Sequence, residues 1–529
     1  MLNMTHWTSL TLFAAYVVVC SGESRQQWWQ GAQAALAKAL NVKPNTNVAK
    51  NVILFLGDGM DIATITAGRI YKGQKRGKTG EETVTTMESF PFVALSKTYN
   101  DNRQVPDSAG TATAYLCGVK ANVGTLGLDS SVPRSDCAKQ LEGSGHVTSI
   151  LKWSKDEGKA VGIVTTARIT HATPAASYAH SADRDWESPW NLREGNATKC
   201  PDIAAQLFDN VDIDVMMGGG RRNILLNTTE DPETGKVDKR QRTDGRDLVE
   251  EWKNSKAAKR KNATYVWNKG QLDAVDPKKT DCLLGLFASS HMQFELDRDN
   301  STNGDPSIAE MSKKAIEILN KNKKGYFLLV EGGRIDHGHH KNSAIRALED
   351  FVAFDNAISV AVEMTNEKDT LIVVTADHGH TFSIGGSQPR GNNILGFVGD
   401  QPGYLFTPYD HMPYTTLSYA NGPGHLRRNL TGIKTDSRDY LQYNSVRMRY
   451  ETHGGQDVAI FARGPMSHLF HSVQEQNYIA HVMAYASCVG SNKKHCSSVN
   501  TPQGGSSVRV GAVTLVVCFL AVYRNANID

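Results

Sequence analysis

The stretch YFLLVEGGRIDHGHH, residues 326–340, joins an unbroken apolar run to a cluster of acidic and histidine residues. The apolar run Tyr326–Val330 has no polar alternation, which is typical of a strand buried on both faces. Similar runs occur at Asn51–Leu56, Ala160–Thr166, Ile213–Met217, Thr370–Thr375 and Val458–Ala462. Helical patterns lie between them, for example at Ser108–Gly118, Ser307–Asn320 and Asn342–Met364. This alternation predicts an α/β fold with a central, mostly parallel sheet flanked by helices on both faces.

The alternation is interrupted between the last two of these strands. Residues 385–451 are rich in Gly, Pro, Tyr and Asn and have little helical periodicity, so we expect an inserted subdomain there. The α/β domain then comprises residues 22–384 and 452–490. An amphipathic segment, Arg25–Leu40, precedes the first strand, and we expect it to pack outside the core or on a partner subunit.

Composition excludes two broad classes of protein. Of the 529 residues, 40% are hydrophobic and 21% are charged, so the chain is neither disordered nor collagen-like. The formal net charge is only +3. A balance this close to neutral argues against nucleic acid as a partner.

Both ends of the chain have the features of targeting segments. Residues 1–21 contain the apolar run Leu10–Cys20, which is too short to span a membrane and predicts a signal peptide. Residues 491–529 contain a polar stretch, Ser497–Ser507, followed by the apolar run Val510–Tyr523. That order predicts a polar spacer and a glycosylphosphatidylinositol (GPI) attachment signal, and hence a location on the extracellular face of the plasma membrane. The last residues, 524–529, are polar, which leaves a retained single span and a soluble form open.

Sequons and cysteines also indicate the secretory pathway. Five Asn-x-Ser/Thr sequons follow the predicted signal peptide, and we expect glycosylation at Asn196, Asn227, Asn262, Asn300 and Asn429. An oxidising compartment favours disulfides. The closely spaced Cys488 and Cys496 are the easiest pair to propose, and Cys137 with Cys200 is a second pair. Cys117 lies in an apolar, helix-like stretch, where a buried free thiol is expected.

Acidic and histidine residues gather at the ends of the predicted strands, where open α/β sheets carry their functional residues. They are Asp58, Glu331, Asp336, His340, Asp377 and His378 after their strands and His453 ahead of Val458–Ala462. Buried carboxylates and imidazoles without partners are costly, so this cluster needs a cation. Carboxylate oxygen with imidazole nitrogen suits a catalytic zinc site, and an all-oxygen subset suits magnesium. Asp336 and His340 are four residues apart, so one helical turn can present both to one ion.

Ser108 is a candidate nucleophile. It stands at the apparent start of a helix, in Pro106-Asp107-Ser108-Ala109-Gly110. Backbone N–H groups and the helix dipole favour an anion at such a position. Most serines in this position are helix caps, but the small residues that follow Ser108 permit a substrate to approach closely.

Together these motifs resemble those of the animal, membrane-anchored alkaline phosphatases. The motifs are Gly57-Asp58-Gly59-Met60, Asp107-Ser108-Ala109-Gly110-Thr111-Ala112, Val330-Glu331-Gly332-Gly333-Arg334-Ile335-Asp336-His337-Gly338-His339-His340, Thr375-Ala376-Asp377-His378 and Thr452-His453. They follow the family's order over about residues 25–490. The resemblance implies zinc-dependent hydrolysis of phosphate monoesters to an alcohol and inorganic phosphate through a phosphoserine. It also implies a homodimer and a crown-like subdomain at residues 385–451.

The resemblance implies a role for each site residue. Ser108 would be the nucleophile, and Arg184 would hold two phosphate oxygens. Two Zn²⁺ and one Mg²⁺ are implied per subunit: one zinc bound by Asp336, His340 and His453, the other by Asp58, Asp377 and His378, and magnesium by Asp58, Thr173 and Glu331. His171 and His337 match histidines that lie near the magnesium in animal members.

Two positions depart from the family pattern. Asp61 stands where a small glycine is usual, which alters the packing near the site. Animal relatives can bind calcium in the region of Glu233, Phe287 and Asp305, but Ala288 stands where they supply a carboxylate, so we do not expect calcium. A metal-dependent phosphodiesterase of the same superfamily and an inactive surface binding protein remain alternative functions.

Overall fold

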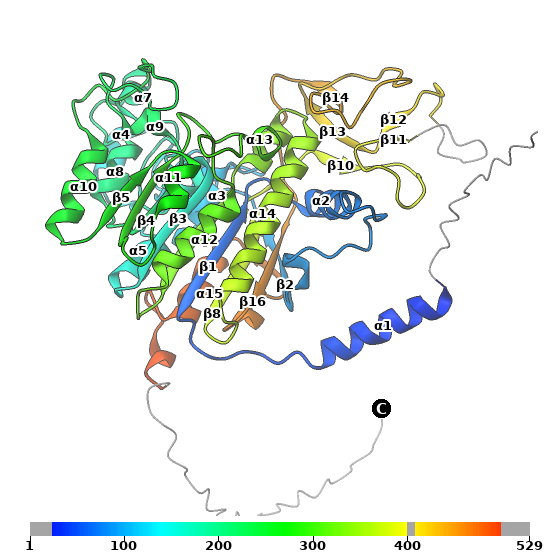
Figure 1. Cartoon of the computed structure of the whole chain (residues 1–529), viewed down its shortest axis with the longest axis horizontal. Coiled ribbons are helices and arrows are strands. Elements are labelled where there is room, and N and C mark those ends of the chain that lie inside the picture. Colours follow the sequence, from blue (N-terminus) through cyan, green and yellow to red (C-terminus); the bar gives the residue numbers. More distant parts are fainter. Residues whose placement is uncertain (1–23, 399–407, 499–529) are drawn as a thin grey trace, which may run out of the picture.

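One ten-stranded sheet is the centre of the computed structural model, which describes residues 24–398 and 408–498 (Figure 1). The strands follow the order β17-β2-β16-β8-β1-β7-β3-β4-β6-β5. Their bounds are β1 (Asn51–Gly57), β2 (Phe92–Lys97), β3 (Ala160–Arg168), β4 (Val215–Gly219), β5 (Ala263–Val266), β6 (Cys282–Leu286), β7 (Tyr326–Gly332), β8 (Thr370–Ala376), β16 (Val458–Arg463) and β17 (Val473–Glu475). Within this sheet β16 alone runs antiparallel to its neighbours, β2 and β8. The predicted mostly parallel α/β sheet is confirmed.

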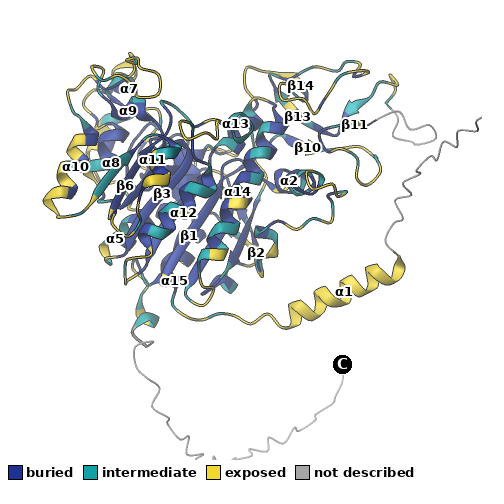
Figure 2. Ribbon diagram, viewed as in Figure 1, coloured by how far each residue is buried: buried dark blue, intermediate teal, exposed yellow. Residues whose placement is uncertain are grey.

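Helices lie on both faces of this sheet. The α-helices of the described residues are α1 (Arg25–Leu40), α2 (Ile62–Gln74), α3 (Ser108–Cys117), α4 (Cys137–Leu141), α5 (Ile150–Asp156), α6 (Ala172–Ala175), α7 (Pro189–Glu194), α8 (Ile203–Asp209), α9 (Arg221–Ile224), α10 (Leu248–Ala258), α11 (Lys269–Ala274), α12 (Ile308–Leu319), α13 (Arg334–His340), α14 (Ala344–Met364) and α15 (Tyr478–Ser487). Alternate residues of β1 enter different cores: Val52 and Leu54 pack with α3, α5 and α15, whereas Ile53 and Phe55 pack with α12 and α14. Figure 2 shows β1 buried along its length, which explains its nearly continuous apolar sequence.

The sequence prediction omits β2, β5, β6 and β17. The pattern of β2 alternates between buried and half-exposed or exposed positions, so it has no continuous apolar run. The strands β5 and β17 have only four and three residues. β6 is fully buried, but it is short and contains a glycine. Short or half-exposed strands give weak sequence signals because little of their length is apolar.

Three small sheets lie beyond the main one. β10 (Phe382–Ile384), β13 (Leu417–Gly422) and β14 (Tyr443–Arg447) form one, β11 (Phe397–Val398) and β12 (Tyr414–Thr415) another, and β9 (Gly379–His380) and β15 (His453–Gly454) the third. The sheets of β10 to β14 form the lobe at the upper right of Figure 1. The inserted subdomain at residues 385–451 and the division of the chain around it stay predictions.

The first helix stands apart from the rest of the fold. α1 has a capping box at Ser24 and Gln27 but no buried residue, and Trp28 and Trp29 are 60% and 69% exposed. Figure 2 shows it exposed along its whole length. Among the described residues, no helix is both long and apolar enough to cross a membrane. The predicted signal peptide and most of the predicted GPI signal lie outside the described residues.

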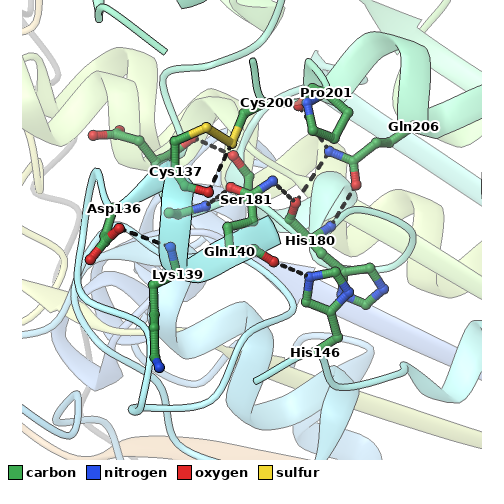
Figure 3. The surroundings of a disulfide bond; sticks show 12 residues. Asp136, Cys137, Lys139, Gln140, His146, His180, Ser181, Cys200, Pro201 and Gln206 are labelled. Carbon is green, nitrogen blue, oxygen red and sulfur yellow. Dashed lines mark hydrogen bonds between the residues drawn. A yellow bond between two sulfur atoms is a disulfide. The ribbon is translucent and has the colours of Figure 1, made fainter. Parts of the chain in front are cut away.

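Two disulfides close loops in the part of the chain that the structure describes. Cys137 bonds to Cys200 beside α4, where Gln140 links the loop to the backbone of His180 (Figure 3). Cys488 bonds to Cys496 after α15. These are the two pairs proposed from the sequence. Cys117 and Cys282 are buried free thiols.

Candidate active site

The predicted ligand residues meet at one edge of the main sheet because of the strand directions. β1, β7 and β8 are parallel neighbours, and Asp58, Glu331 and Asp377 lie at or just beyond their carboxyl ends. β16 is antiparallel, so the edge at which the other strands end is the edge at which β16 begins. His453 therefore precedes its strand in the sequence and still reaches the same edge.

The first cluster contains Asp336, His340 and His453. Asp336 Oδ1 lies 3.3 Å from His340 Nε2, one turn away on α13, and 3.4 Å from His453 Nε2. The two Nε2 atoms are 3.1 Å apart. His340 Nδ1 contacts the carbonyl oxygen of Glu451 at 2.6 Å, and His453 Nδ1 contacts that of Pro106 at 2.8 Å. With Nδ1 donating to a carbonyl, the Nε2 lone pairs of both rings face the centre of the cluster.

The second cluster surrounds the buried Ser108 side chain. His378 Nε2 lies 3.2 Å from Ser108 Oγ, 3.1 Å from Asp377 Oδ2 and 3.5 Å from Asp58 Oδ1. Ser108 Oγ itself is 3.5 Å from Asp58 Oδ1. The rings of His378 and His453 stack with their centroids 3.6 Å apart, so the two clusters are contiguous.

A third group lies on the other side of Asp58. Asp58, Glu331 and His171 have ligand atoms within 4.8 Å of one another. Thr165 and Thr173 hydrogen-bond to Glu331, and the Tyr115 hydroxyl lies 3.4 Å from Thr173 Oγ1. Carboxylate and hydroxyl oxygens dominate this group, which is the donor chemistry that magnesium prefers.

Arg184 is held beside Ser108 by two contacts. Its Nη1 donates to Asp107 Oδ2 at 2.9 Å, and its Nη2 donates to His171 Nε2 at 3.2 Å. Asp107 is the N-cap of α3 and also accepts from the Gly110 amide at 3.1 Å. The residue that caps the serine helix therefore also orients the guanidinium.

Burial of these ionisable groups is energetically unfavourable when no cation is bound to them. Burial, followed by the charges of Asp377 and Asp336, raises the pKa of Asp58 well above its usual range. Burial raises the pKa of Glu331 to about 7 against the lowering effect of its threonine hydrogen bonds. Burial also holds the pKa of His378 well below its usual range, so this imidazole is neutral with its lone pair free.

Two orphaned oxygen atoms test whether metal ions fit. Asp58 Oδ2 and Glu331 Oε1 are buried and have no hydrogen-bond donor among the residues that the structure describes. Buried carboxylate oxygens without donors are rare in folded proteins, because each such atom is costly. Divalent cations bound by oxygen and imidazole nitrogen would satisfy these atoms, so the residues fit the metals that the sequence predicts.

Sequence reasoning missed two residues at the first cluster, His380 and Glu451. His380 Nε2 lies 2.9 Å from Asp336 Oδ1, and its Nδ1 lies 2.6 Å from Glu451 Oε2. Burial lowers the pKa of His380, but the charges of Glu451 and Asp336 outweigh it and raise this pKa to about 10. Spacing is the available signal: His380 is two residues from His378, and Glu451 two from His453.

His171 and His337, which the resemblance places near the magnesium, lie together, and His291 joins them. The ring centroids of His171 and His337 are 5.6 Å apart, and that of His291 is 4.3 Å from His337. Each imidazole faces an arginine donor, since Arg184, Arg168 and Arg334 contact His171, His291 and His337 respectively. Burial holds the pKa of all three imidazoles well below their usual range, so they are neutral rings packed beside the third group of ligands.

The region that resembles a calcium site does not fit calcium. Arg221 is fully buried, its Nε lies 2.9 Å from Asp231 Oδ2, and its Nη2 contacts Glu233. Ala288 supplies no side-chain oxygen, and Asp305 accepts the Gln293 amide at 3.1 Å. A guanidinium already pairs with the carboxylates of Asp231 and Glu233 here, and the absence of calcium stays a prediction.

The five predicted sequon asparagines are all exposed. They lie in loops or at the ends of elements, at Asn196, Asn227, Asn262, Asn300 and Asn429. Exposure permits glycosylation, which stays a prediction.

Comparisons with known proteins agree over most of the chain. The family model described as alkaline phosphatase matches residues 49–489. The tissue-nonspecific alkaline phosphatase of Mus musculus is 52% identical over 505 residues, which cover 94% of each chain. The human tissue-nonspecific isozyme is 51% identical, again over 94% of each chain. An alkaline phosphatase of Gadus morhua is 51% identical over 88% of this chain and 98% of its own.

Solved structures show the same fold at greater distance. The alkaline phosphatase of Thermus thermophilus superimposes with a TM-score of 0.59 and 23% identity, covering 84% of this chain and 93% of its own. That of the Antarctic bacterium TAB5 gives a TM-score of 0.57 with 21% identity, covering 84% of this chain and 100% of its own. A variant of the Antarctic enzyme has magnesium bound in its M3 site.

Proposed function

The chain belongs to the alkaline phosphatase family and hydrolyses phosphate monoesters, and we propose that Ser108 is the nucleophile of this reaction. One observation carries the proposal: Ser108 Oγ is buried at the start of α3, 3.2 Å from His378 Nε2 and 3.5 Å from Asp58 Oδ1. A serine that only capped a helix would not need an imidazole and a carboxylate at its hydroxyl.

The family is metal-dependent, and the clusters suggest how this chain binds its ions. Two Zn²⁺ and one Mg²⁺ would be held, one zinc by Asp336, His340 and His453, the other by Asp58, Asp377 and His378, and magnesium by Asp58, Thr173 and Glu331. When bound, the ions supply positive charge that lowers the pKa of the serine hydroxyl and neutralises the transferred phosphoryl group.

The protein side chains then position the substrate and the nucleophile. The Arg184 guanidinium, fixed by Asp107 and His171, donates to two non-bridging phosphate oxygens. Ser108 Oγ bonds to phosphorus, the bond from phosphorus to the ester oxygen breaks, and the alcohol leaves with a proton. Water then attacks the phosphoserine, releases inorganic phosphate and returns a proton to Ser108 Oγ.

The Ser108→Ala variant tests this assignment. We expect kcat for a chromogenic phosphate monoester to fall by about 10³-fold or more, because no covalent intermediate can form. The intact mass after an acid quench should gain one phosphate in the wild type and none in the variant. Ser383→Ala, in the exposed part of β10, is the matched control and should keep its activity. Normal turnover by Ser108→Ala would remove the nucleophile assignment.

A comparison of ester classes separates the phosphomonoesterase from the phosphodiesterase alternative. We expect kcat/KM for a monoester to exceed that for the matching diester, because Arg184 is placed to hold a phosphate with free non-bridging oxygens. Preference for the diester would instead favour the alternative.

The exposed helix α1 and the predicted targeting segments suggest where the enzyme is located and how it assembles. We place the signal peptide at residues 1–21 and the GPI signal at 491–529, so that phosphatidylinositol-specific phospholipase should release activity from membranes. A homodimer would cover the apolar side chains that α1 leaves exposed. Replacing Trp28 and Trp29 by serine should then weaken dimerisation in sedimentation experiments.

A further inference from the structure

Asp61 is a buried carboxylate just beyond the metal-ligand cluster. It follows Gly59 and Met60, three residues after Asp58, and only 1% of its surface is exposed. The family pattern has a small glycine at this position, so the roles described above do not account for a carboxylate here. Its two oxygen atoms contact different parts of the site.

Asp61 Oδ1 connects the α2 terminus to the helix that carries Asp336 and His340. It accepts from the Thr64 amide at 2.8 Å as the N-cap of α2, and from the Thr64 hydroxyl at 2.9 Å. Thr64 Oγ1 then lies 3.0 Å from Nε2 of His339, which is on α13. Since the Thr64 hydroxyl donates to Asp61, the His339 Nε2–H donates to Thr64.

Asp61 Oδ2 connects the same loop to the two-stranded sheet of β9 and β15. It accepts from Gln456 Nε2 at 2.5 Å and from the His380 amide at 3.3 Å. Gln456 Nε2 also donates to the His380 carbonyl at 2.9 Å. In this small sheet His380 pairs with His453, and His378 directly precedes β9.

Two glycines allow the Gln456 side chain to cross this small sheet. A Cβ atom on Gly379 would lie 2.4 Å from Gln456 Nε2 and 2.8 Å from Asp61 Oδ2. A Cβ atom on Gly454 would lie 2.1 Å from Gln456 Oε1. The contact of Asp61 with Gln456 is therefore packed against the backbone of both strands.

We propose that Asp61 is a positioning residue that holds four ligand-bearing segments in register. These segments are the loop of Asp58, helix α13, the β8–β9 connection with Asp377 and His378, and β15 with His453. The proposal rests on the proposed zinc pair, whose ligands come from these segments. Its consequence is slow zinc release, because separating the segments requires breaking the Asp61 hydrogen bonds.

The test measures zinc release from the purified holoenzyme into excess chelating dye at 25 °C. In Asp61→Asn the amide oxygen can still accept from the Thr64 amide and cap α2. The NH₂ group, however, then faces the N–H donors of Gln456 and His380, so both of those hydrogen bonds are lost. We expect zinc release about 10-fold faster than in the wild type, with kcat lowered more than KM is raised. In Gln456→Glu alone, the introduced carboxylate faces that of Asp61, so zinc release should also be faster than in the wild type.

Exchanging donor and acceptor should partly rescue the defect. In the double variant Asp61→Asn with Gln456→Glu, the amide introduced at position 61 can donate to the carboxylate introduced at position 456, whereas the contacts with the His380 backbone stay lost, so zinc release should be slower than in either single variant. Asp247→Asn is the matched control, since Asp247 caps α10 through the Glu250 amide and touches no ligand-bearing segment. If Asp61→Asn fails to fold, Gln456→Ala leaves the cap of α2 intact and should still release zinc several-fold faster.

The outcomes separate this inference from the proposed function. Release rates equal to those of the wild type and Asp247→Asn, or a double variant no better than the singles, would overturn the role of Asp61. A wild-type enzyme that holds no zinc would instead overturn the proposed zinc pair.

Discussion

Two groups of acidic residues in this molecule are neutralised in different ways: the ligand cluster around Asp58 and Glu331, and the Arg221 cluster, in which Arg221 contacts Asp231 and Glu233. At the carboxyl edge of the sheet, Asp58 and Glu331 each have a buried oxygen atom with no donor among the described residues. Beside β6, Asp231 receives two hydrogen bonds from the Arg221 guanidinium, at 2.9 and 3.0 Å. In the ligand cluster these two oxygen atoms have no protein donor within the described ranges, whereas in the Arg221 cluster the guanidinium donates to both oxygen atoms of Asp231.

The difference is the reason why we propose a metal site at only one of the two clusters. A guanidinium supplies positive charge and five donors in a fixed geometry, so it satisfies carboxylates permanently. A buried carboxylate without such a partner is stable only when protonated or bound to a cation. Acidic residues by themselves therefore do not identify a metal site, and buried carboxylate oxygens without a protein donor are the more informative feature.

The largest expected effect comes from changing a carboxylate of the ligand cluster. Asp377→Asn should lower kcat by about 10³-fold and lower the bound zinc, because the site loses a charged ligand. Steady-state kinetics and elemental analysis of the purified protein measure both quantities. Asp231→Asn is the control, and it should retain kcat and zinc. Equal losses of zinc in the two variants would contradict the distinction between the clusters.

Breaking the Arg221 cluster should affect stability and leave catalysis intact. In Arg221→Met the carboxylates of Asp231 and Glu233 lose their guanidinium, which should lower the free energy of unfolding by about 3–5 kcal/mol. Denaturant unfolding of the metal-loaded enzyme measures this change. The folded fraction should keep its kcat, and a kcat that falls in proportion to the loss of stability would place Arg221 in the catalytic machinery instead.

Asp350 provides an intermediate case, a buried carboxylate for which the described residues provide neither a metal ligand set nor an ion pair. It accepts the Glu295 amide at 3.0 Å, and burial raises its pKa to about 8. The pKa of Asp350 is higher in the folded protein than in the unfolded chain. The contribution of Asp350 to folding stability is therefore fully present below about pH 4 and is lost as the pH rises through 8. Asp350→Asn should therefore gain stability over the wild type, by on the order of 3 kcal/mol between pH 5 and 8.

Denaturant unfolding of both proteins at pH 5, 6.5 and 8 measures that pH dependence. A constant difference between Asp350→Asn and the wild type across these values would show that Asp350 does not titrate in this range.

The smallest expected effect is that of calcium. Arg221 already neutralises Glu233, and Ala288 offers no oxygen ligand, so millimolar calcium should shift the Tm of the zinc-loaded enzyme by no more than about 1 °C. Thermal unfolding with and without calcium checks this expectation. A rise of several degrees that disappears in Glu233→Gln would show that calcium displaces the guanidinium.

The fold was largely predictable because its strands are buried on both faces. Strands such as Asn51–Gly57 and Thr370–Ala376 have unbroken apolar sequences, and their glycine and acidic endings mark the functional edge. β2 and β17 escaped prediction because half-exposed or three-residue strands have no such signature. The candidate ligands were found because they follow or precede strong strands.

By itself the sequence determined the α/β class, the chemistry of the ligand side chains and the family to which the chain belongs, since these depend on local apolar runs and on motifs of adjacent residues. Only the tertiary structure decided that His380 and Glu451 join Asp336, that Arg221 pairs with Asp231 and Glu233 and that Asp61 contacts Gln456. Those contacts connect residues from separate segments, many of them far apart along the chain. No local pattern encodes such pairings, because they depend on which strands become neighbours and in which direction each one runs.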